Sequence, residues 1–173
     1  MIVIPLLHNR CAIIDDEDWE RVCQLSWYAK CDGRSGYWYA VHNMGRKHGW
    51  KHIMMHRFIL GGDSPQIDHI NHNGLDCQRE NMRPSTVPQN QWNSRLRVDN
   101  TSGYKGVSLH NGAWQAIIHG DGRRVTLGTF PTALEAAYAY DQAAVKYFGE
   151  FALTNERLGT LKPERSERQA LDA

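Results

Sequence analysis

The last third of the chain has the clearest pattern of apolar and polar positions. Three short segments of strand character cover residues 104–109, 114–118 and 124–130. The dipeptides Asn111-Gly112 and Asp121-Gly122 lie between them, and both are strong hairpin signals. The pattern therefore predicts three strands joined by tight turns.

A helix is expected directly after these strands. Pro131 precedes a capping box from Thr132 to Glu135, in which each side chain satisfies a backbone N–H of the first turn. An alanine-rich run follows, and Gly149 ends the predicted helix. The tail over residues 156–173 is polar, and we expect it to be flexible.

The first sixty residues favour strands and turns followed by a short helix. The apolar run 53–60 predicts a buried helix that Gly61 and Gly62 end. Within this run we expect His56 to face the core and Arg57 the surface. A lone histidine on an apolar helix is more often structural than catalytic.

The stretch 66–94 predicts two short strands and a helix. Residues 66–70 form the first strand, 71–74 open a loop, and 81–83 return as the second strand. A helix begins near residues 85–88, where a proline is tolerated because the first turn does not need its N–H.

Composition limits the classes of protein that fit. The chain has 173 residues, 41% hydrophobic, with 6 Trp, so one ordinary domain or two small ones with real cores are expected. No apolar run approaches the roughly 18 residues of a membrane span. The start lacks a basic segment and a cleavage site of the secretory kind. We therefore expect a soluble, cytoplasmic protein.

Charge is close to balanced, at a formal +1, which by itself argues against a nucleic-acid partner. Its distribution changes that view. Five acids crowd positions 15–20, whereas residues 33–62 and 81–98 contain none. The acidic run predicts a solvated turn or helix start, with a metal site as the less favoured alternative. The acid-free stretch 33–62 mixes bases with aromatics, as phosphate-tracking surfaces do.

Four cysteines, none in a C-x-x-C pair, indicate neither a redox motif nor a structural zinc site. We expect buried, reduced thiols. The cysteines are Cys11, Cys23, Cys31 and Cys77.

Four polar residues stand at informative places in the stretch 66–94. Asp68 and His69 end the first predicted strand, Asn81 lies at the return strand, and Asn90 lies on the helix. A carboxylate and an amide oxygen are hard ligands that suit Mg²⁺ or Mn²⁺. A neutral imidazole is a suitable general base near neutral pH. Each residue alone would also fit an ordinary turn or cap.

These residues lie in motifs that resemble the HNH nucleases, in particular phage and intron-encoded homing-type members. The motifs are DHINHNG at 68–74, RENMR at 79–83 and PQNQWN at 88–93, with MHRFILG upstream. The resemblance implies a ββα-metal fold in which His69 activates water. It also implies that Asp68 and Asn90 hold one divalent ion, and that Asn81 orients the loop or the His69 ring. Asn90 stands where many members have histidine.

Several basic residues around these motifs are candidates for contacting DNA phosphates, although each would also serve as a solvated surface charge. The candidates are Lys51, Arg57, Arg79, Arg83, Arg95 and Arg97, with Arg34, Arg46 and Lys47 elsewhere in the acid-free stretch. For His72, a solvated loop position is favoured over a metal or phosphate contact.

The C-terminal unit resembles the apetala/ethylene-response-factor (AP2/ERF) DNA-binding domain. GYKGV at 103–107, VTLGTF at 125–130, the helix at 132–144 and FALTN at 151–155 carry the match, with Trp114 in the middle strand. The resemblance implies a sheet that enters the DNA major groove with the helix packed behind it.

Positions carried over from that family divide into two sets. The DNA-facing set is Lys105, Ser108, His110, His119, Arg124 and Thr126, with Arg123 adjacent, and the core set is Val107, Trp114, Leu127 and Phe130. Four bases balance four acids between residues 101 and 155, so weak or tethered binding is expected. A purely structural or protein-binding sheet is the alternative.

Together the observations predict an α+β protein with three parts: an HNH nuclease domain at 1–98, an AP2/ERF-like domain at 99–155 and the tail. The expected function is homing-type, metal-dependent nicking or double-strand cutting of duplex DNA by a monomer or weak dimer. No small-molecule cofactor and no membrane partner are expected. The resemblance implies the bacterial host cell of a phage or mobile element. The alternatives are a catalytically inactive DNA-binding regulator and an RNA-binding or structural protein.

Overall fold

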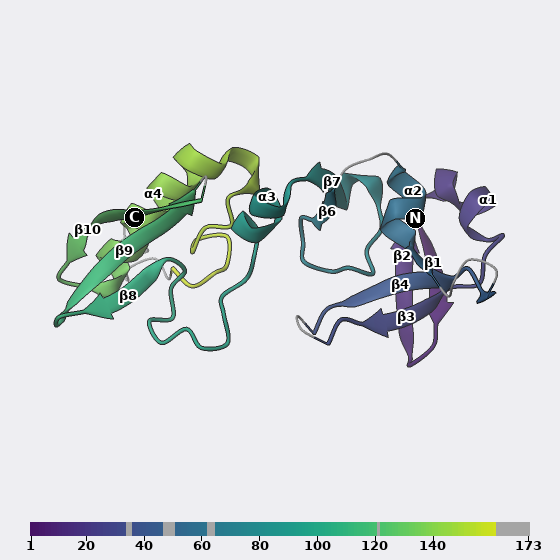
Figure 1. The fold of residues 1–173 in the computed structure, drawn as a ribbon, viewed down its shortest axis with the longest axis horizontal. Helices are drawn as coiled ribbons and strands as arrows, with labels where there is room; N and C mark the ends of the chain where they lie inside the picture. The colour runs from purple at the N-terminus through teal and green to yellow at the C-terminus, as the bar shows by residue number, and fades with distance from the viewer. Residues whose placement is uncertain (34–35, 47–50, 62–64, 121, 162–173) are drawn as a thin grey trace, which may run out of the picture. The chain divides into compact units, whose positions relative to one another are not determined.

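The computed structural model describes residues 1–33, 36–46, 51–61, 65–120 and 122–161. It divides into two compact units, Met1–Asn90 and Gln91–Ala173, and mixes helices with antiparallel sheets in each (Figure 1). Among the described residues, no helix is long and apolar enough to cross a membrane.

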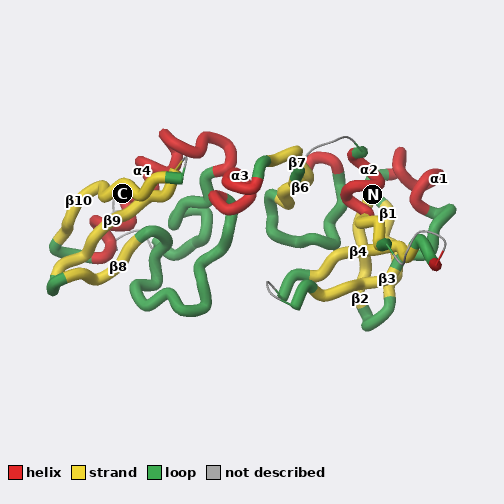
Figure 2. The backbone as a smooth tube through the Cα atoms, viewed as in Figure 1, coloured by secondary structure: helices red, strands yellow, loops and turns green. Residues whose placement is uncertain are grey.

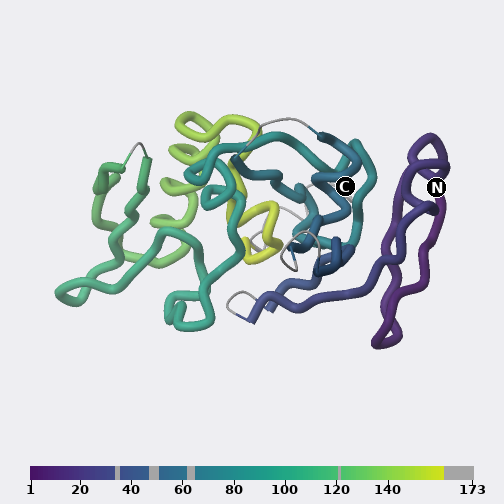
Figure 3. The backbone as a smooth tube through the Cα atoms, turned by 45° about the vertical axis from the view of Figure 1, so that its right-hand side comes forward, coloured from purple at the N-terminus to yellow at the C-terminus, as the bar shows by residue number. Residues whose placement is uncertain are grey.

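The first unit begins with a hairpin of strands β1 (Ile2–Leu6) and β2 (Arg10–Ile14), whose tight turn holds His8 and Asn9 at positive φ (Figure 3). A 3₁₀ turn at Asp16–Asp18 and helix α1 (Trp19–Val22) follow.

A second sheet of the first unit has the order β3-β4-β5. Its strands are β3 (Tyr28–Cys31), β4 (Trp38–Asn43) and β5 (His52–Met54), all antiparallel. Helix α2 (Met55–Leu60) follows without a loop. The predicted helix over 53–60 therefore starts two residues late, because Ile53 and Met54 pair with β4.

The predicted pair of strands and the helix after it are present. Strands β6 (Gln66–His69) and β7 (Met82–Ser85) pair antiparallel, with a 3₁₀ turn at Arg79–Asn81 before β7. Helix α3 (Val87–Trp92) comes next.

The core of the first unit explains which cysteine is buried. Cys77 packs among Ile14, Met55, Ile59 and other apolar side chains. The expectation of buried thiols was wrong for Cys11, Cys23 and Cys31, which are exposed. In β2 the alternation of the strand turns Ala12 and Ile14 inward, and Cys11 therefore faces outward.

The second unit has the predicted sheet of three strands with one helix. The sheet order is β10-β9-β8, from β8 (Val107–His110), β9 (Ala113–Gly120) and β10 (Arg123–Phe130). Helix α4 (Ala133–Phe148) packs on one face, and Thr132 caps it by accepting a hydrogen bond from the Glu135 N–H (Figure 2). A 3₁₀ turn at Gly149–Phe151 follows.

The core of this unit lies between sheet and helix. Val107, Ala116 and Ile118 meet an alanine- and aromatic-rich face of α4. Trp114, Leu127 and Phe130 pack at its margin, half-buried, so the predicted core set is confirmed. Gly106 has φ +73°, and a Cβ there would overlap the Tyr140 ring.

The end of α3 and the segment after it are folded into the second unit. The Trp92 ring stacks on Phe148, with centroids 4.4 Å apart and planes at 13°. The Lys105 ammonium donates to the carbonyls of Trp92 and Ser94, at 2.6 and 2.7 Å. The units therefore divide after Asn90, whereas the sequence pattern places the boundary after Val98.

The start of the polar tail is also ordered by contacts. The Asp141 carboxylate accepts a hydrogen bond from the Glu156 N–H, Thr160 donates to the Asn155 carbonyl, and Leu161 packs against the core. The first part of the predicted flexible tail, up to Leu161, thus makes contacts with the second unit, and residues 162–173 lie outside the described ones.

Candidate functional site

The loop between β6 and β7 is shaped by asparagine and aspartate side chains that bond to nearby backbone. Asn71 Oδ1 accepts from the Asn73 N–H at 2.8 Å, and Asn73 Oδ1 from the Leu75 N–H at 3.2 Å. Asn71 Nδ2 also donates to Asp76 at 2.7 Å. Such local bonds replace the partners that helix or sheet would supply. The NHNGLD sequence therefore forms a compact loop.

Asn81 closes this loop from inside. Its side chain is buried, accepts from the Asn71 N–H at 3.0 Å and donates to the Asp76 carbonyl at 2.8 Å. Its own carbonyl accepts from the Ile70 N–H at 2.9 Å. The resemblance implies that Asn81 orients either the loop or the His69 ring. These contacts correspond to the first role, orienting the loop after His69.

The acidic run near the N-terminus anchors the same loop. Asp18 is 1% exposed and receives the Arg79 side chain at 3.0 and 2.7 Å, while Asp15 accepts from the Arg79 N–H at 2.8 Å. The Ile13 N–H and carbonyl bond to the loop at Leu75 and Cys77. The expectation of a solvated turn was wrong for Asp18, because its side chain is buried against Arg79. Arg79 lies sixty-one residues away in the sequence, so the local pattern around Asp18 does not indicate this partner.

Asp68 is a buried carboxylate with a cationic neighbour. It is 3% exposed, and Arg83, its partner across the β6–β7 ladder, places Nε and Nη2 at 2.8 and 2.7 Å from Oδ2. A buried charge requires such pairing. Arg83, a candidate for phosphate contact, is thus held by Asp68.

Asn90 approaches the hairpin from α3. Its Nδ2 lies 3.5 Å from Gln66 Oε1. Residues two apart on a strand share a face, so Gln66 and Asp68 lie on the same side of β6. The structure thus brings Asn90 to the face of the hairpin that carries Asp68.

His69 belongs to a buried cluster of aromatic rings. Its ring centroid lies 5.0 Å from that of His56 and 6.0 Å from that of Tyr39. Burial lowers the pKa of His69 to about 4, although Asp68 and Asp76 raise it. Burial, then His69 and Arg57, lower the pKa of His56 to about 3. Both imidazoles are therefore neutral at neutral pH.

The sequence places His56 correctly in the core and Arg57 on the surface. It does not reveal that His56 touches His69. Gly74 permits the approach of this loop to β4, because a Cβ there would overlap the Trp38 carbonyl and the Tyr39 ring.

The other candidate bases of the first half have varied surroundings. Lys51 and Arg57 are exposed, and Arg57 Nη2 donates to the Pro65 carbonyl at 2.8 Å. Arg95 and Arg97 are exposed, and Arg97 pairs with Asp99. Arg46 is exposed, while Arg34 and Lys47 lie outside the described residues.

The second unit gathers five of the predicted DNA-facing residues on one face. Ala116 and Ile118 of β9 turn toward α4, so Gln115, Ile117 and His119 turn away from it. Cross-strand pairing places the expected residues on that same open face. These residues are Ser108 opposite Gln115, Thr126 opposite Ile117, Arg124 opposite His119, and His110.

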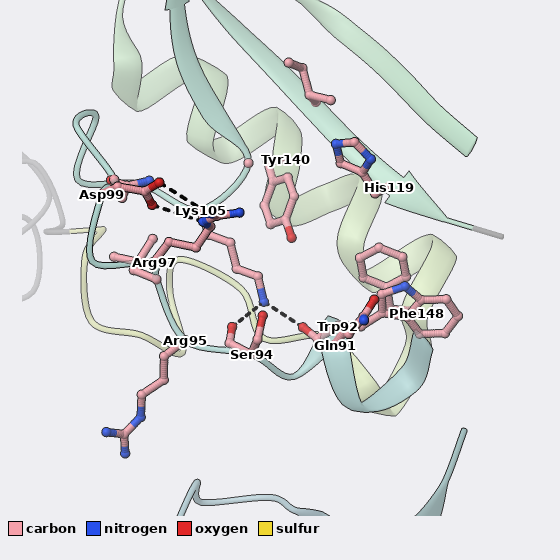
Figure 4. A pocket seen from close by; sticks show the side chains of 14 residues that line it. Gln91, Trp92, Ser94, Arg95, Arg97, Asp99, Lys105, His119, Tyr140 and Phe148 are labelled. Atoms are coloured by element: carbon pink, nitrogen blue, oxygen red, sulfur yellow. Dashed lines mark hydrogen bonds and ion pairs between the residues drawn. The ribbon is translucent and has the colours of Figure 1, made fainter. Parts of the chain in front are cut away.

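Lys105 and Arg123 lie elsewhere. The Lys105 ammonium is directed to the carbonyls of Trp92 and Ser94, in a pocket that Tyr140 and His119 also line (Figure 4). Burial lowers its pKa to about 8, against a raising effect of Asp141. Arg123 is exposed at the first position of β10, opposite Gly120.

A buried polar network in the second unit was not foreseen. Asn155 is fully buried, accepts from the Lys105 N–H at 2.6 Å and donates to the Lys105 carbonyl at 3.1 Å. Asp141 receives both the Asn155 N–H and Nδ2 at 2.8 Å. In the sequence, Asn155 and Asp141 stand out only as parts of the FALTN and helix motifs of the AP2/ERF resemblance. The motifs do not indicate that these two side chains bond to each other.

The fold and the site define a two-unit α+β protein in which a buried carboxylate, a buried histidine and a buried asparagine lie on one hairpin and a second asparagine lies on the helix after it. No family model and no solved structure matches the chain. An uncharacterized HNH endonuclease of Acanthamoeba polyphaga mimivirus is 30% identical over 152 residues, which cover 84% of this chain and 74% of that protein. The chain therefore belongs to the HNH endonuclease family.

Plant proteins match a shorter part. An Arabidopsis thaliana AP2/ERF and B3 domain-containing transcription factor is 44% identical over 66 residues, which are 38% of this chain and 18% of that protein. Dehydration-responsive element-binding protein 2A of Oryza sativa is 51% identical over 55 residues, 30% of this chain and 20% of the relative. The chain thus spans only a small part of these factors.

Proposed function

We propose that the chain is a homing-type, metal-dependent DNA endonuclease whose general base is His69. The observation that carries the proposal is His69, buried at the end of β6 directly after Asp68 and at the start of the loop that Asn81 holds. Membership of the HNH endonuclease family supports it.

The order of elements supports a ββα-metal core. Strands β6 and β7 pair as a hairpin, and α3 follows directly. Asp68 and His69 come from the first strand and Asn90 from the helix, which are the places that the family pattern assigns to them.

The donor set fits a hard divalent ion. Asp68 would supply a carboxylate oxygen and Asn90 an amide oxygen, the ligands that Mg²⁺ and Mn²⁺ prefer. Among the described residues, no group of three or more His, Cys, Asp or Glu side chains gathers to hold a metal. Mg²⁺ commonly uses one or two carboxylates together with water and substrate phosphate. When bound, the ion would stabilise negative charge on the phosphate and the leaving oxygen.

The protein's own residues supply the proton transfer and its geometry. His69 accepts the proton of the attacking water, for which its neutral form is required. Asn81 fixes the loop that begins at His69, and Arg79 with its acidic partners anchors the far end of that loop.

The second unit directs the chain to duplex DNA through its open sheet face. Arg124 and His119 lie across from each other on that face. Because the unit is neutral over residues 101–155, its affinity rests on a few specific contacts. Linking it to the nuclease unit raises the effective concentration of both at one DNA.

A catalytically inactive DNA-binding regulator is the second candidate. The observation that favours it is the Asp68–Arg83 ion pair, in which a cation already offsets the charge of the carboxylate.

Incubation of the full chain with supercoiled plasmid in Mg²⁺ or Mn²⁺ distinguishes the two. We expect nicked or linear product that EDTA abolishes. Asn90→Ala should abolish cutting, whereas Gln91→Ala, an exposed amide one residue later, should leave it intact. Binding of the plasmid without cutting in any of several divalent ions would favour the regulator.

A further inference from the structure

A cleft of the first unit lies beside the candidate site. It has a volume of about 520 Å³. One wall is a single face of the β3-β4-β5 sheet, because Lys30 lies opposite Tyr39 and Val41 opposite Met54 in the ladder. Pockets of roughly 300–1,000 Å³ are typical of ligand sites.

Other lining residues come from the elements that carry the candidate site, and Asn90 is the one site residue among them. They include Asn90 of α3, Gln66 of β6, and His56 and Arg57 of α2. His56 contacts the His69 ring, and Asn90 is the proposed amide ligand of the divalent ion. Asp68 and His69 are not among the lining residues, so a ligand in the cleft would lie against Asn90 and against His56, whose ring contacts His69.

The cleft has the chemistry of a nucleic-acid strand site. Lys30 and Arg57 supply cationic groups at exposed positions, and Asp32 is the one acid among the described lining residues. The Tyr39 ring and the Met54 side chain supply apolar surface, as sugars and bases require. The acid-free stretch 33–62 provides most of this lining.

We propose that this cleft binds the backbone of the DNA strand to be cut, with Lys30 and Arg57 each contacting a phosphate. The inference rests on the proposed function, since duplex DNA is its ligand. Charge complementarity and the position beside Asn90 select this occupant.

Native thiols provide a direct footprint. Cys31 is exposed and lines the cleft, whereas Cys11 and Cys23 are exposed and do not line it. Alkylation of the full chain is followed by mass spectrometry with and without saturating duplex DNA, in Ca²⁺ so that binding is read apart from cutting. DNA should slow alkylation of Cys31 at least about fivefold and leave Cys23 within about twofold. Equal rates at Cys31 with bound DNA would overturn the proposal.

Salt dependence provides the second measurement. The slope of log affinity against log salt falls by about 0.9 for each lost phosphate contact to B-DNA. Lys30→Gln and Arg57→Gln should each lower it by about that amount, whereas Lys146→Gln, an exposed lysine on α4, should not. Unchanged slopes in both cleft variants would refute the cleft while leaving the proposed function standing.

Two further outcomes are distinguishable. A wild-type chain that binds no duplex DNA would contradict the proposed function itself. Protection of Cys31 by a deoxynucleoside monophosphate at lower phosphate concentration than by DNA would mean that the cleft takes a free nucleotide, contrary to the proposal.

Discussion

Each unit is held by a buried asparagine that bonds a backbone N–H with its oxygen and a backbone carbonyl with its amide nitrogen. In the first unit Asn81 joins the Asn71 N–H to the Asp76 carbonyl. In the second unit Asn155 takes both the N–H and the carbonyl of Lys105. The device is the same, but only the first shapes a loop that begins at a candidate catalytic residue.

The two asparagines both contribute to stability, but only Asn81 lies next to a candidate catalytic group. Leaving a buried polar group without its partner costs about 1–3 kcal/mol, so both asparagines stabilise their units. Asn81 also orients the chain after His69. Asn155 instead fixes the approach to β8, where Gly106 packs against Tyr140. Substitution of Asn81 should therefore affect the proposed chemistry, whereas substitution of Asn155 should affect only the fold of the second unit.

Asn155→Ala is expected to have the largest effect on stability. It removes bonds to Lys105 and to Asp141 in a fully buried setting, at about 3–4 kcal/mol. Calorimetry should show that the second unit unfolds at a lower temperature than in the wild type. Hydrogen exchange should accelerate at residues 104–110 but not at 69–77. Gln142→Ala, an exposed amide on α4, is the control. Equal acceleration in both regions would contradict separate roles.

Asn81→Ala should destabilise the first unit by about 2–3 kcal/mol, because two side-chain bonds are lost. Hydrogen exchange should accelerate at residues 69–77, and plasmid cutting should fall even at temperatures where the chain remains folded. Asn155→Ala provides the reciprocal comparison. Full cutting by folded Asn81→Ala would show that the loop needs no such clamp.

The stability of the first unit should depend on pH in the acid range, and that of the second unit in the alkaline range. The pKa of His56 falls to about 3 in the folded state, so between pH 6.5 and 3 the unfolded chain binds more protons. The first unit therefore loses stability as pH falls through that range, with His69 acting in the same direction. The pKa of Lys105 falls to about 8, so the second unit gains stability as pH rises from 8 to 10.5.

Thermal unfolding across pH measures both responses. His56→Phe, which keeps an aromatic ring in the cluster, should weaken the acid response, and Lys105→Met the alkaline one. An acid response unchanged in His56→Phe would assign it to other groups.

Arg124→Gln should have the smallest effect on folding. The side chain is exposed, so stability should change by less than about 0.5 kcal/mol. Affinity for duplex DNA should fall, with a salt slope lower by about 0.9. Binding equal to that of the wild type would remove Arg124 from the DNA-facing set.

Local patterns predicted the second unit closely. The hairpin dipeptides and the Thr132 capping box each act within a few residues, so β9, β10 and α4 begin and end near the expected positions, whereas β8 begins three residues after its expected start. The positions carried over from the AP2/ERF resemblance included Ser108 and Thr126, which cross-strand pairing puts on the face away from α4.

Contacts between distant residues were beyond such patterns. The pairing of Asp18 with Arg79, and of Lys105 with the Trp92 carbonyl, depends on the folded chain and leaves no periodic signal. The same is true of the contact between His56 and His69. Motif spacing brought Asp68 and Asn90 to one hairpin and helix, but it did not reveal Arg83 on Asp68.

The central claim is that His69 takes the proton from water in a metal-dependent cut. The direct test is the rate of plasmid nicking by His69→Ala in Mg²⁺ and Mn²⁺, with affinity for the same DNA measured in Ca²⁺. His72→Asn is the control, because His72 has φ +63° and asparagine tolerates that conformation. We predict a loss of at least about a hundredfold for His69→Ala with unchanged affinity. A His69→Ala protein that cuts as fast as His72→Asn would contradict the account.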